Sequence, residues 1–341
     1  MHFIFLLFFE LLASADAYLW NPANDPSNMD INRIYNYSLE QLPVKAELVT
    51  PPWSETYWAT YKGSINYRWN SENPSGYNYR PPTREKALKM SDAELRQLAP
   101  SEKYDLLMGR YDYPLFWEAR SYSNPRAQVW SGICDGWSVA ATQYPEPAAI
   151  TLINPDGIAV PFGSSDIKGL MSFAAAIHFK SEPRQVGLKC GIWPYTSGCS
   201  DINAGSLHVI FSNQIGIKQE AFVTEINSGR EIWNQPTYGY EVEYRGTSMN
   251  TSGEKGILVH AVLHYTDELE ESRWDPVVGT SEFKNDKLEM DYILDLDQDG
   301  KIIGGTWINS SDKPDFVWLP TKKLKFDGYL SGINLLIPLQ Q

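Results

Sequence analysis

The chain has 341 residues, which is enough for one large domain or two ordinary ones with a proper hydrophobic core. Its 42 acidic residues outnumber its 29 basic residues and give a formal net charge of −13. This balance argues against nucleic acids and anionic membranes as partners, because both attract basic surfaces.

The N-terminus predicts a signal peptide over residues 1–17. A short apolar run is followed by Ala15-Asp16-Ala17, and the run is too short to span a bilayer. Only His2 offers a positive charge ahead of the run and Glu10 interrupts it, so a short core segment is the alternative. No other stretch has the apolar length of a membrane helix. We therefore expect a secreted, soluble protein.

The helical signals lie in the first half of the chain. Residues 18–80 are rich in Asn, Pro, Tyr, Trp and Ser and predict irregular structure with short strands. Residues 91–94 (Ser-Asp-Ala-Glu) match a capping box that starts a helix, and residues 101–108 predict a second one. A helix-compatible run follows at 135–142. The cluster Ser164-Ser165-Asp166 predicts the N-cap of a helix with a largely apolar sequence.

Strand signals dominate beyond residue 200. Residues 207–211 and 221–226 form short apolar or alternating runs, and residues 257–265 alternate cleanly. Residues 288–296 and 301–308 predict a hairpin. A helical first part followed by an antiparallel sheet predicts an α+β fold.

The change from irregular and helical signals to strand signals also predicts how the chain is divided into regions. After the signal peptide at residues 1–17, an N-terminal irregular and helical region covers residues 18–120 and packs on a catalytic core over residues 121–341. No internal repeat or low-complexity linker marks the boundary near residue 120. A single domain is therefore the alternative.

Three cysteines are present, Cys134, Cys190 and Cys199. The last two flank a loop rich in turn residues, so in an oxidising compartment they most simply form a disulfide, worth about 2–3 kcal/mol. Reduced thiols or a metal site are the alternatives, although no second Cys/His pair at zinc-finger spacing accompanies them. Their pairing leaves Cys134 as an intermolecular linker, a buried inert thiol or a nucleophile.

The sequence around Cys134 favours the nucleophile. Cys134 opens a predicted helix, whose positive end lowers the pKa of a thiol, and nearby glycines allow close backbone approach on both sides. Upstream, the side-chain amide of Gln128 is a candidate donor to an oxyanion, together with the Cys134 N–H. Trp130 and Trp137 are candidates to bind substrate and to exclude water.

A thiol nucleophile needs a base, and His208 is the best candidate. It stands inside the glycine-led apolar strand predicted at 205–211, where a polar residue needs a partner that a thiolate could supply. His260 and His264 lie on one face of an alternating strand and predict a solvent-facing pair, and His178 lies in a predicted helix. His208 follows Cys134 by 74 residues, which is less than papain-like peptidases require.

A third group should orient the imidazole. Glu225 and Asn227 share one face of the next predicted strand. A carboxylate both fixes the tautomer and stabilises the imidazolium, which favours Glu225 over Asn227. Two solvated residues at a sheet edge are the alternative.

Four segments of the chain resemble the oomycete-type secreted transglutaminases, also called transglutaminase elicitors, which have bacterial relatives. Pro100–Gly109 is similar to the family's pre-catalytic stretch, Gly132–Trp137 to its nucleophile motif, and Phe162–Lys168 to a downstream helix start. Ile232–Val242, with Trp-Asn-Gln-Pro, parallels the surface peptide through which plants recognise the oomycete enzymes. The resemblance covers roughly residues 55–310 in consistent order.

The resemblance implies a papain-like arrangement with a Cys-His-acid triad. Cys134 matches the nucleophile and His208 the histidine, while Glu225 stands where the family has aspartate. Asp135 also departs from the family pattern, and an acid there would raise the pKa of the thiol. The implied reaction is acyl transfer: Cys134 attacks a glutamine carboxamide, ammonia leaves, and a lysine amine resolves the thioester. The implied partners are proteins that bear glutamine and lysine.

The turn within the predicted hairpin resembles part of a calcium-binding loop. Asp295, Asp297 and Asp299 match the first ligand positions, but Thr306 stands where such a loop has its bidentate Glu. A hairpin turn rich in Asp and Gly is the better account, and a loosely held calcium is the alternative. No other cofactor is predicted.

Two further function classes stay open beside the transglutaminase. A cysteine peptidase or glutamine deamidase would share the triad and differ in what resolves the thioester. A secreted recognition protein with an inert Cys134 would share only the fold. The sequence does not predict an oligomeric state.

Overall fold

The computed structural model describes residues 20–189, 201–227, 229, 231–250, 253–309 and 313–337. The predicted signal peptide and the predicted Cys190–Cys199 disulfide lie outside these residues. No helix of the described part combines the length and the apolar character that a membrane crossing requires.

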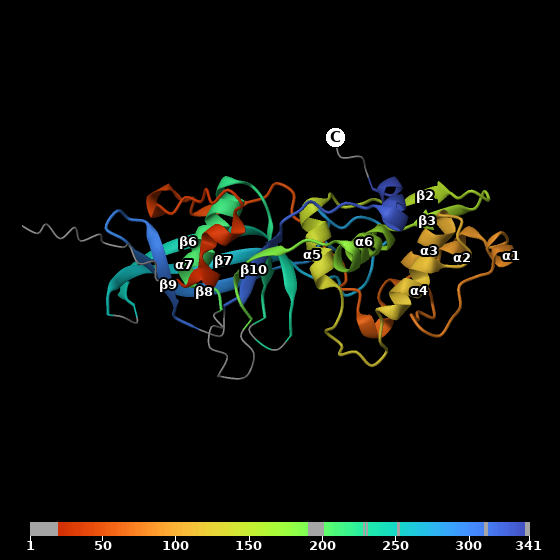
Figure 1. The fold of residues 1–341 in the computed structure, drawn as a ribbon, viewed down its shortest axis with the longest axis horizontal. Coiled ribbons are helices and arrows are strands. Elements are labelled where there is room, and N and C mark those ends of the chain that lie inside the picture. Colours follow the sequence, from red (N-terminus) through yellow and green to blue (C-terminus); the bar gives the residue numbers. More distant parts are fainter. Residues whose placement is uncertain are drawn as a thin grey trace, which may run out of the picture.

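The molecule has a helical half and a sheet half that lie side by side (Figure 1). The helical half contains α1 (Arg84–Ala87), α2 (Asp92–Arg96), α3 (Pro100–Leu107), α4 (Pro114–Ser121), α5 (Cys134–Gln143), α6 (Ser164–Phe173), and the hairpin of β2 (Ile150–Ile153) and β3 (Ala159–Phe162). A π turn (Ala174–His178) extends α6, and the C-terminal 3-10 segment η8 (Gly328–Leu335) packs against this half. Shorter 3-10 segments lie at Pro22–Asn24, Pro26–Met29, Leu39–Gln41, Thr60–Lys62 and Ser64–Asn66.

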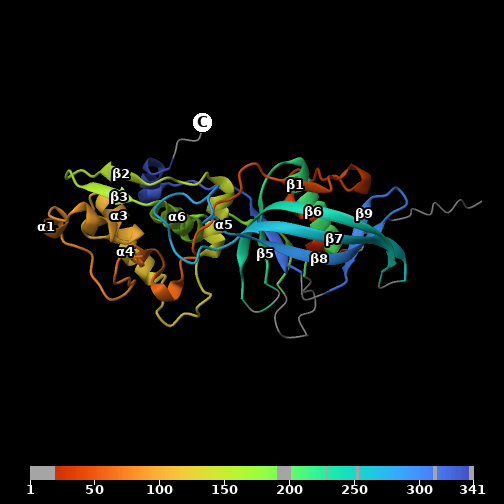
Figure 2. The same ribbon diagram turned by 180° about the vertical axis from the view of Figure 1, so that it is seen from behind.

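The sheet half is an eight-stranded antiparallel sheet in the order β4-β10-β5-β6-β7-β8-β9, with β1 paired to β6. Its strands are β1 (Lys45–Glu47), β4 (Pro183–Gly187), β5 (Phe222–Glu225), β6 (Asn234–Met249), β7 (Lys255–Thr266), β8 (Asn285–Leu296), β9 (Ile302–Trp307) and β10 (Phe316–Pro320). One helix, α7 (Ala204–Phe211), packs on β8 and β9 and continues into a π turn (Ser212–Ile217). Figure 2 shows the opposite face of the sheet.

The predicted α+β fold is confirmed, and so are most of the predicted elements. The Ser91 capping box starts α2, since the Ser91 hydroxyl accepts from the Glu94 N–H and the Glu94 carboxylate accepts from the Ser91 N–H. Strands β5, β7 and the β8–β9 hairpin cover the predicted ranges. Helices α3, α5 and α6 start within one or two residues of their predicted positions.

The strand predicted at residues 207–211 is wrong, because this segment forms α7. The Asn203 side chain accepts hydrogen bonds from the Gly205 and Ser206 N–H groups and so starts a helix. Every residue of α7 is buried, so the sequence carries no polar face that would reveal a helical period. His208 therefore lies on a helix and not on a strand.

The segment Ile232–Val242 contains the start of β6, which begins at Asn234 and runs for 16 residues. Residues 234–240 are all buried. The part of the chain that parallels the family's surface peptide is therefore largely enclosed in this structure.

Two hydrophobic cores divide the molecule, and neither follows the predicted boundary. One core gathers residues from 53–179 and 324–336 around α3 to α6, and the other gathers residues from 20–42 and 186–317 around the sheet. The boundary predicted near residue 120 falls inside the first core. The chain therefore crosses between the halves more than once, and α5 lies where they meet (Figure 1).

A buried ion pair connects α3 to α6 within the first core. The Lys103 ammonium donates to Asp166 Oδ2 at 2.6 Å, and both side chains are fully buried. The Asp166 carboxylate also accepts from the Gly163 N–H and from Trp69 Nε1. Asp166 thus caps α6 and neutralises the Lys103 ammonium.

Replacing Asp166 with Asn should lower the free energy of unfolding by about 3–5 kcal/mol, because it leaves a buried ammonium without a counter-charge. Urea denaturation followed by circular dichroism measures this loss. The matched control is Asp92→Asn, which breaks an exposed pair with Arg96 and should cost less than about 1 kcal/mol. Equal losses in the two variants would contradict the role assigned to Asp166.

Candidate active site

Cys134 is the first residue of α5, at the seam between the two halves. Its helix packs on α6 on one side and on β5 and β6 on the other. The Ile133 N–H donates to the Tyr57 carbonyl at 2.8 Å, which fixes the chain just before the cysteine. The thiol therefore lies at the positive end of the helix dipole, as the sequence predicted.

The two glycines of the motif are required by close packing. A Cβ at Gly132 would lie 2.2 Å from the Tyr57 carbonyl oxygen, and one at Gly136 would lie 2.1 Å from the Ser172 carbonyl oxygen. Any side chain at either position would force the backbone away from its neighbour. The expected close backbone approach on both sides of Cys134 is confirmed.

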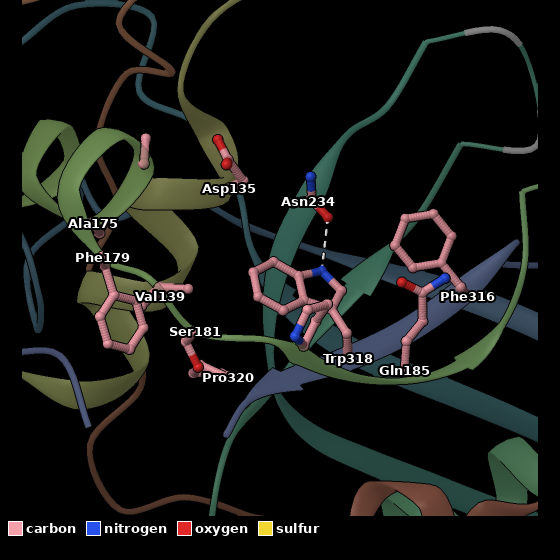
Figure 3. Close-up of a pocket in the computed structure, with 12 residues that line it drawn as sticks. Asp135, Val139, Ala175, Phe179, Ser181, Gln185, Asn234, Phe316, Trp318 and Pro320 are labelled. Carbon is pink, nitrogen blue, oxygen red and sulfur yellow. Dashed lines mark hydrogen bonds between the residues drawn. The ribbon is translucent and has the colours of Figure 1, made fainter. Parts of the chain in front are cut away.

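The sulfur of Cys134 faces the residues that begin β6. Asn234 Nδ2 lies 3.9 Å from Sγ and the Ile232 carbonyl oxygen lies 3.7 Å from it. The backbone N–H of Asn234 also acts on the sulfur as a donor. Trp318 Nε1 donates to Asn234 Oδ1 at 2.8 Å (Figure 3), and this bond turns the NH₂ group of Asn234 toward the sulfur.

Burial dominates the chemistry of this thiol. It raises the pKa of Cys134 to about 12, the Asn234 donors lower the pKa again, and the charges of Asp135 and Glu268 raise it. The resting side chain is therefore a neutral thiol at physiological pH. A reaction at this sulfur requires that a proton leaves as the new bond forms.

The structure does not bring His208 to Cys134. The ring of His208 is fully buried on α7, with Nδ1 2.8 Å from the Tyr292 hydroxyl and Nε2 3.4 Å from the Tyr244 hydroxyl. Burial lowers the pKa of His208 to about 3, which keeps the imidazole neutral. These contacts make His208 part of the core beneath the sheet.

The remaining imidazoles of the described residues also lie elsewhere. His178 pairs with Glu118 at 3.2 Å and His260 with Asp291 at 3.0 Å. His264 packs its ring against Tyr238. None of these rings hydrogen-bonds to Cys134 in the part of the chain that the structure describes.

Glu225 is placed close to the motif, but it does not contact an imidazole. Its Oε1 accepts from Lys189 Nζ at 3.3 Å and from the Trp233 N–H at 3.2 Å. Burial raises the pKa of Glu225 to about 7 despite the charge of Lys189. Glu225 therefore holds the backbone that precedes Asn234, and Asn227 donates its N–H to the same oxygen.

Among the described residues, the predicted oxyanion donor and the two tryptophans make no hydrogen bond to the thiol. Gln128 is exposed, and its Oε1 accepts from Trp130 Nε1 at 2.6 Å. Trp137 is fully buried in the helical core and donates to the Trp53 carbonyl at 3.0 Å, so it has no face open to a substrate. The donor at the sulfur is Asn234, which sequence reasoning missed although it lies in the Trp-Asn-Gln-Pro segment.

A hollow of about 290 Å³ lies between Asp135, the residue that follows Cys134, and Asn234 (Figure 3). Asp135 and Val139 of α5 lie on one wall, and Asn234 and Trp318 lie on the opposite wall. The Asp135 side chain is exposed at the rim, yet the surrounding protein raises the pKa of its carboxyl. The hollow thus lies between the residue that follows Cys134 on α5 and the residue that donates to its sulfur.

Glu268 lies on the other side of the residues that face the thiol. It lines a second hollow together with Trp233, whose ring meets that of Tyr57 edge-on at 5.4 Å. Burial, reinforced by the hydrogen bond and charge of Asp267, raises the pKa of Glu268 to about 8. The thiol is thus flanked by two carboxyl groups and one amide.

The possible calcium loop is a hairpin turn between β8 and β9. The Asp297 carboxylate accepts from the Asp299 and Lys301 N–H groups, and the Asp295 carboxylate accepts from Asn250 Nδ2. Across the described residues, no group of three or more His, Cys, Asp or Glu side chains is arranged to hold a metal ion.

Comparisons with known proteins agree with the fold. A model of the transglutaminase elicitor family matches residues 31–90, 120–257 and 248–332. The structure is similar to the crystal structure of the GP42 transglutaminase from Phytophthora sojae, with a TM-score of 0.66 and 21% sequence identity, over 89% of this chain and 92% of that chain. At this identity the likeness concerns the fold. No curated protein sequence matches the chain.

Replacing Glu268 with Gln should stabilise the protein at pH 8 but not at pH 5. The raised pKa means that the folded state holds a proton that the unfolded state releases above its ordinary value near 4.5. Wild-type stability is therefore lost as pH rises toward 8, whereas the variant has no such proton. We expect a melting temperature at least about 2 °C above wild type at pH 8, measured by differential scanning fluorimetry.

The control is Glu271→Gln, an exposed carboxylate whose removal should leave the melting temperature unchanged at both values of pH. A lower melting temperature for Glu268→Gln at pH 8 would mean that the carboxylate stabilises the fold.

Proposed function

Because the chain belongs to the transglutaminase elicitor family, we propose that it is a secreted protein-glutamine γ-glutamyltransferase with Cys134 as its nucleophile. The observation that carries the proposal is the pair of Asn234 donors, backbone N–H and side-chain amide, at the sulfur. Together with the N-terminus of α5, these donors stabilise the negative charge that develops when the thiol attacks an acyl group.

In the proposed first step, a glutamine side chain enters the hollow beside Asp135 and Asn234. The sulfur of Cys134 bonds to the carboxamide carbon as the thiol proton moves to a base, and the Asn234 amide stabilises the oxyanion. The C–N bond then breaks, and the departing nitrogen takes the proton back and leaves as ammonia. A γ-glutamyl thioester on Cys134 remains.

In the proposed second step, a primary amine from a protein lysine attacks the thioester. The new N–C bond forms, the C–S bond breaks, and a proton from the amine returns to the sulfur. The products are an isopeptide bond and the free thiol. Water in place of the amine would give glutamate, so the same site can also deamidate.

We assign the acid–base role in the first step to Asp135. Its carboxyl lines the same hollow as Asn234, and its charge is the larger of the two that act on the thiol. A carboxyl pKa raised by the surroundings lies closer to that of the thiol, which makes proton transfer less unfavourable. Of a papain-like arrangement we propose only the placement of the nucleophile, at a helix N-terminus that faces an antiparallel sheet.

A second candidate is a non-catalytic secreted protein of the same family. The high pKa of Cys134 favours it, because a neutral thiol is a poor nucleophile. The lack of an imidazole at the sulfur, among the described residues, points the same way. This candidate predicts a folded protein without turnover.

The enzyme should incorporate a fluorescent primary amine into a glutamine-rich acceptor protein, and Cys134→Ala should abolish the incorporation. The reason is that no thioester can form without the sulfur. In-gel fluorescence measures incorporation, and the matched control Thr142→Ala changes a residue two turns further along the same helix, whose hydroxyl bonds to the Val139 carbonyl. A wild-type protein that is folded but neither incorporates amine nor releases ammonia would support the non-catalytic candidate.

The base is tested by release of ammonia from a glutamine peptide. Asp135→Asn should lower kcat by at least about 100-fold, as loss of a general acid–base group does, with an unchanged melting temperature. His208→Gln should keep kcat within about threefold once scaled to the folded fraction, because its ring contacts only the core. The opposite pattern would restore His208 as the base that the sequence predicted.

A further inference from the structure

The hollow beside Trp233 and Glu268 has no role in the first step of the reaction. It has a volume of about 390 Å³ and is lined by Ile226, Asn227, Trp233, Gln235, Asp267 and Glu268. Trp233 and Glu268 also line a larger cleft of about 780 Å³, which reaches past Tyr57 to the surface. The small hollow shares Trp233 and Glu268 with this cleft and is the more open of the two to solvent.

Two oxygen atoms in this hollow are buried without a hydrogen-bond donor. They are Oε1 of Glu268 and Oε1 of Gln235, and neither has a partner among the described residues. The Gln235 side chain is 1% exposed, so water does not satisfy its carbonyl freely. Buried acceptors without donors are costly and persist where a ligand supplies the donor.

We propose that this hollow binds the primary ammonium group of the acceptor lysine, which donates to the Glu268 carboxylate and the Gln235 carbonyl. The inference rests on the proposed function and deepens it, because it places the second substrate. An ammonium group has three donors and no acceptor, which matches the two oxygens that lack a donor. The aromatic rings of Trp233 and Tyr57 suit the approach of an alkyl chain that ends in a cation.

The charges around the larger cleft select a cation over an anion. Glu270 and Glu271 line the larger cleft along with Glu268, and Lys62 is its single basic lining residue. The acidic residues therefore attract an amine toward the hollow beside Trp233 and Glu268, and they repel a carboxylate or phosphate. The chain as a whole carries a net charge of −13, which adds to this preference.

The hollow lies next to the reacting sulfur, on the side opposite the glutamine. The residues on either side of Trp233 touch Cys134, through the Ile232 carbonyl and the Asn234 amide. The charge of Glu268 reaches the thiol and raises its pKa. Donor and acceptor substrates would thus approach Cys134 from two hollows that the backbone of residues 232–234 separates.

Glu268 would also prepare the amine for attack. The ammonium gives one proton to the Glu268 carboxylate, and the neutral nitrogen then bonds to the thioester carbon. The C–S bond breaks, a second amine proton passes to the sulfur, and Glu268 releases its proton to solvent. A carboxylate whose pKa is raised toward that of an amine suits this transfer.

The test compares two amines in the complete protein. The variants are Glu268→Gln and Gln235→Met, and the probes are a fluorescent cadaverine, which is cationic at pH 7.5, and hydroxylamine, which is uncharged there. We expect both variants to raise KM for the cadaverine by at least about tenfold, as loss of a hydrogen bond to a charged group does. KM for hydroxylamine should change less than about twofold, because this amine carries no charge for Glu268 to bind.

The control is Gln219→Met, a glutamine that bonds to the Ile215 carbonyl away from both hollows, and it should match wild type with both amines. Ammonia release by wild type verifies the acylation step independently, so its absence would overturn the proposed function and not only this inference. Normal ammonia release with an unchanged cadaverine KM in both variants would overturn the acceptor site alone. A melting temperature that rises with CaCl₂ in wild type but not in Glu268→Gln would reassign the hollow to a divalent cation.

Discussion

The packing of the first turn of α5 against the start of β6 is the constraint on which the site depends. It places the Cys134 sulfur under the Asn234 amide and removes it from water in the same contact. Gly132 and Gly136 make this packing possible, because the backbones of Tyr57 and α6 occupy the space that side chains would need. Trp318 then fixes the orientation of Asn234 from the neighbouring strands. A change in the α5–β6 contact would alter the position, the burial and the donors of the thiol together.

Burial makes the Cys134 thiol difficult to ionise, and any catalytic role of this residue must overcome that difficulty. A thiol with a pKa near 12 is not ionised at neutral pH, and the nearby carboxylates raise its pKa further. Yet desolvation by the surrounding protein raises the pKa values of Asp135 and Glu268, and the charge of Asp267 adds to the rise at Glu268. The raised carboxyl pKa values narrow the difference in pKa between the thiol and its proton acceptor, whereas the raised thiol pKa widens it. A small difference is the condition under which concerted proton transfer replaces prior ionisation. An imidazole is one way to meet that condition and a desolvated carboxylate is another.

Local features of the fold could be predicted from the sequence, whereas the contacts of the site could not. The Ser91–Glu94 capping box and the alternation of β7 are complete within a few residues, and both were predicted correctly. Helix α7 was not predicted, because all its residues are buried and the sequence lacks the polar–apolar period that identifies a helix. His208 was therefore predicted on a strand and as the base, a role that its hydrogen bond to Tyr292 does not support. Asn234 contacts Cys134, which lies 100 residues earlier in the chain, and no local sequence pattern predicts a contact over that separation. The motif residues were recognisable, but their partners depend on how the two halves pack.

The buried polar groups of this molecule are of two kinds: those whose buried charges are paired and those that keep an oxygen without a hydrogen-bond donor. Lys103 and Asp166 are buried, but each satisfies the other, so their burial supports the fold. Glu268 and Gln235 are also enclosed, yet each keeps an oxygen without a donor, and the Asp267 charge adds repulsion to one of them. A protein selected for stability alone would replace such groups with neutral or apolar ones, since stabilising changes of this kind are easily found. In the proposed acceptor site, beside an acidic cleft, these oxygens have a function that offsets the cost, because they can accept hydrogen bonds from a substrate cation.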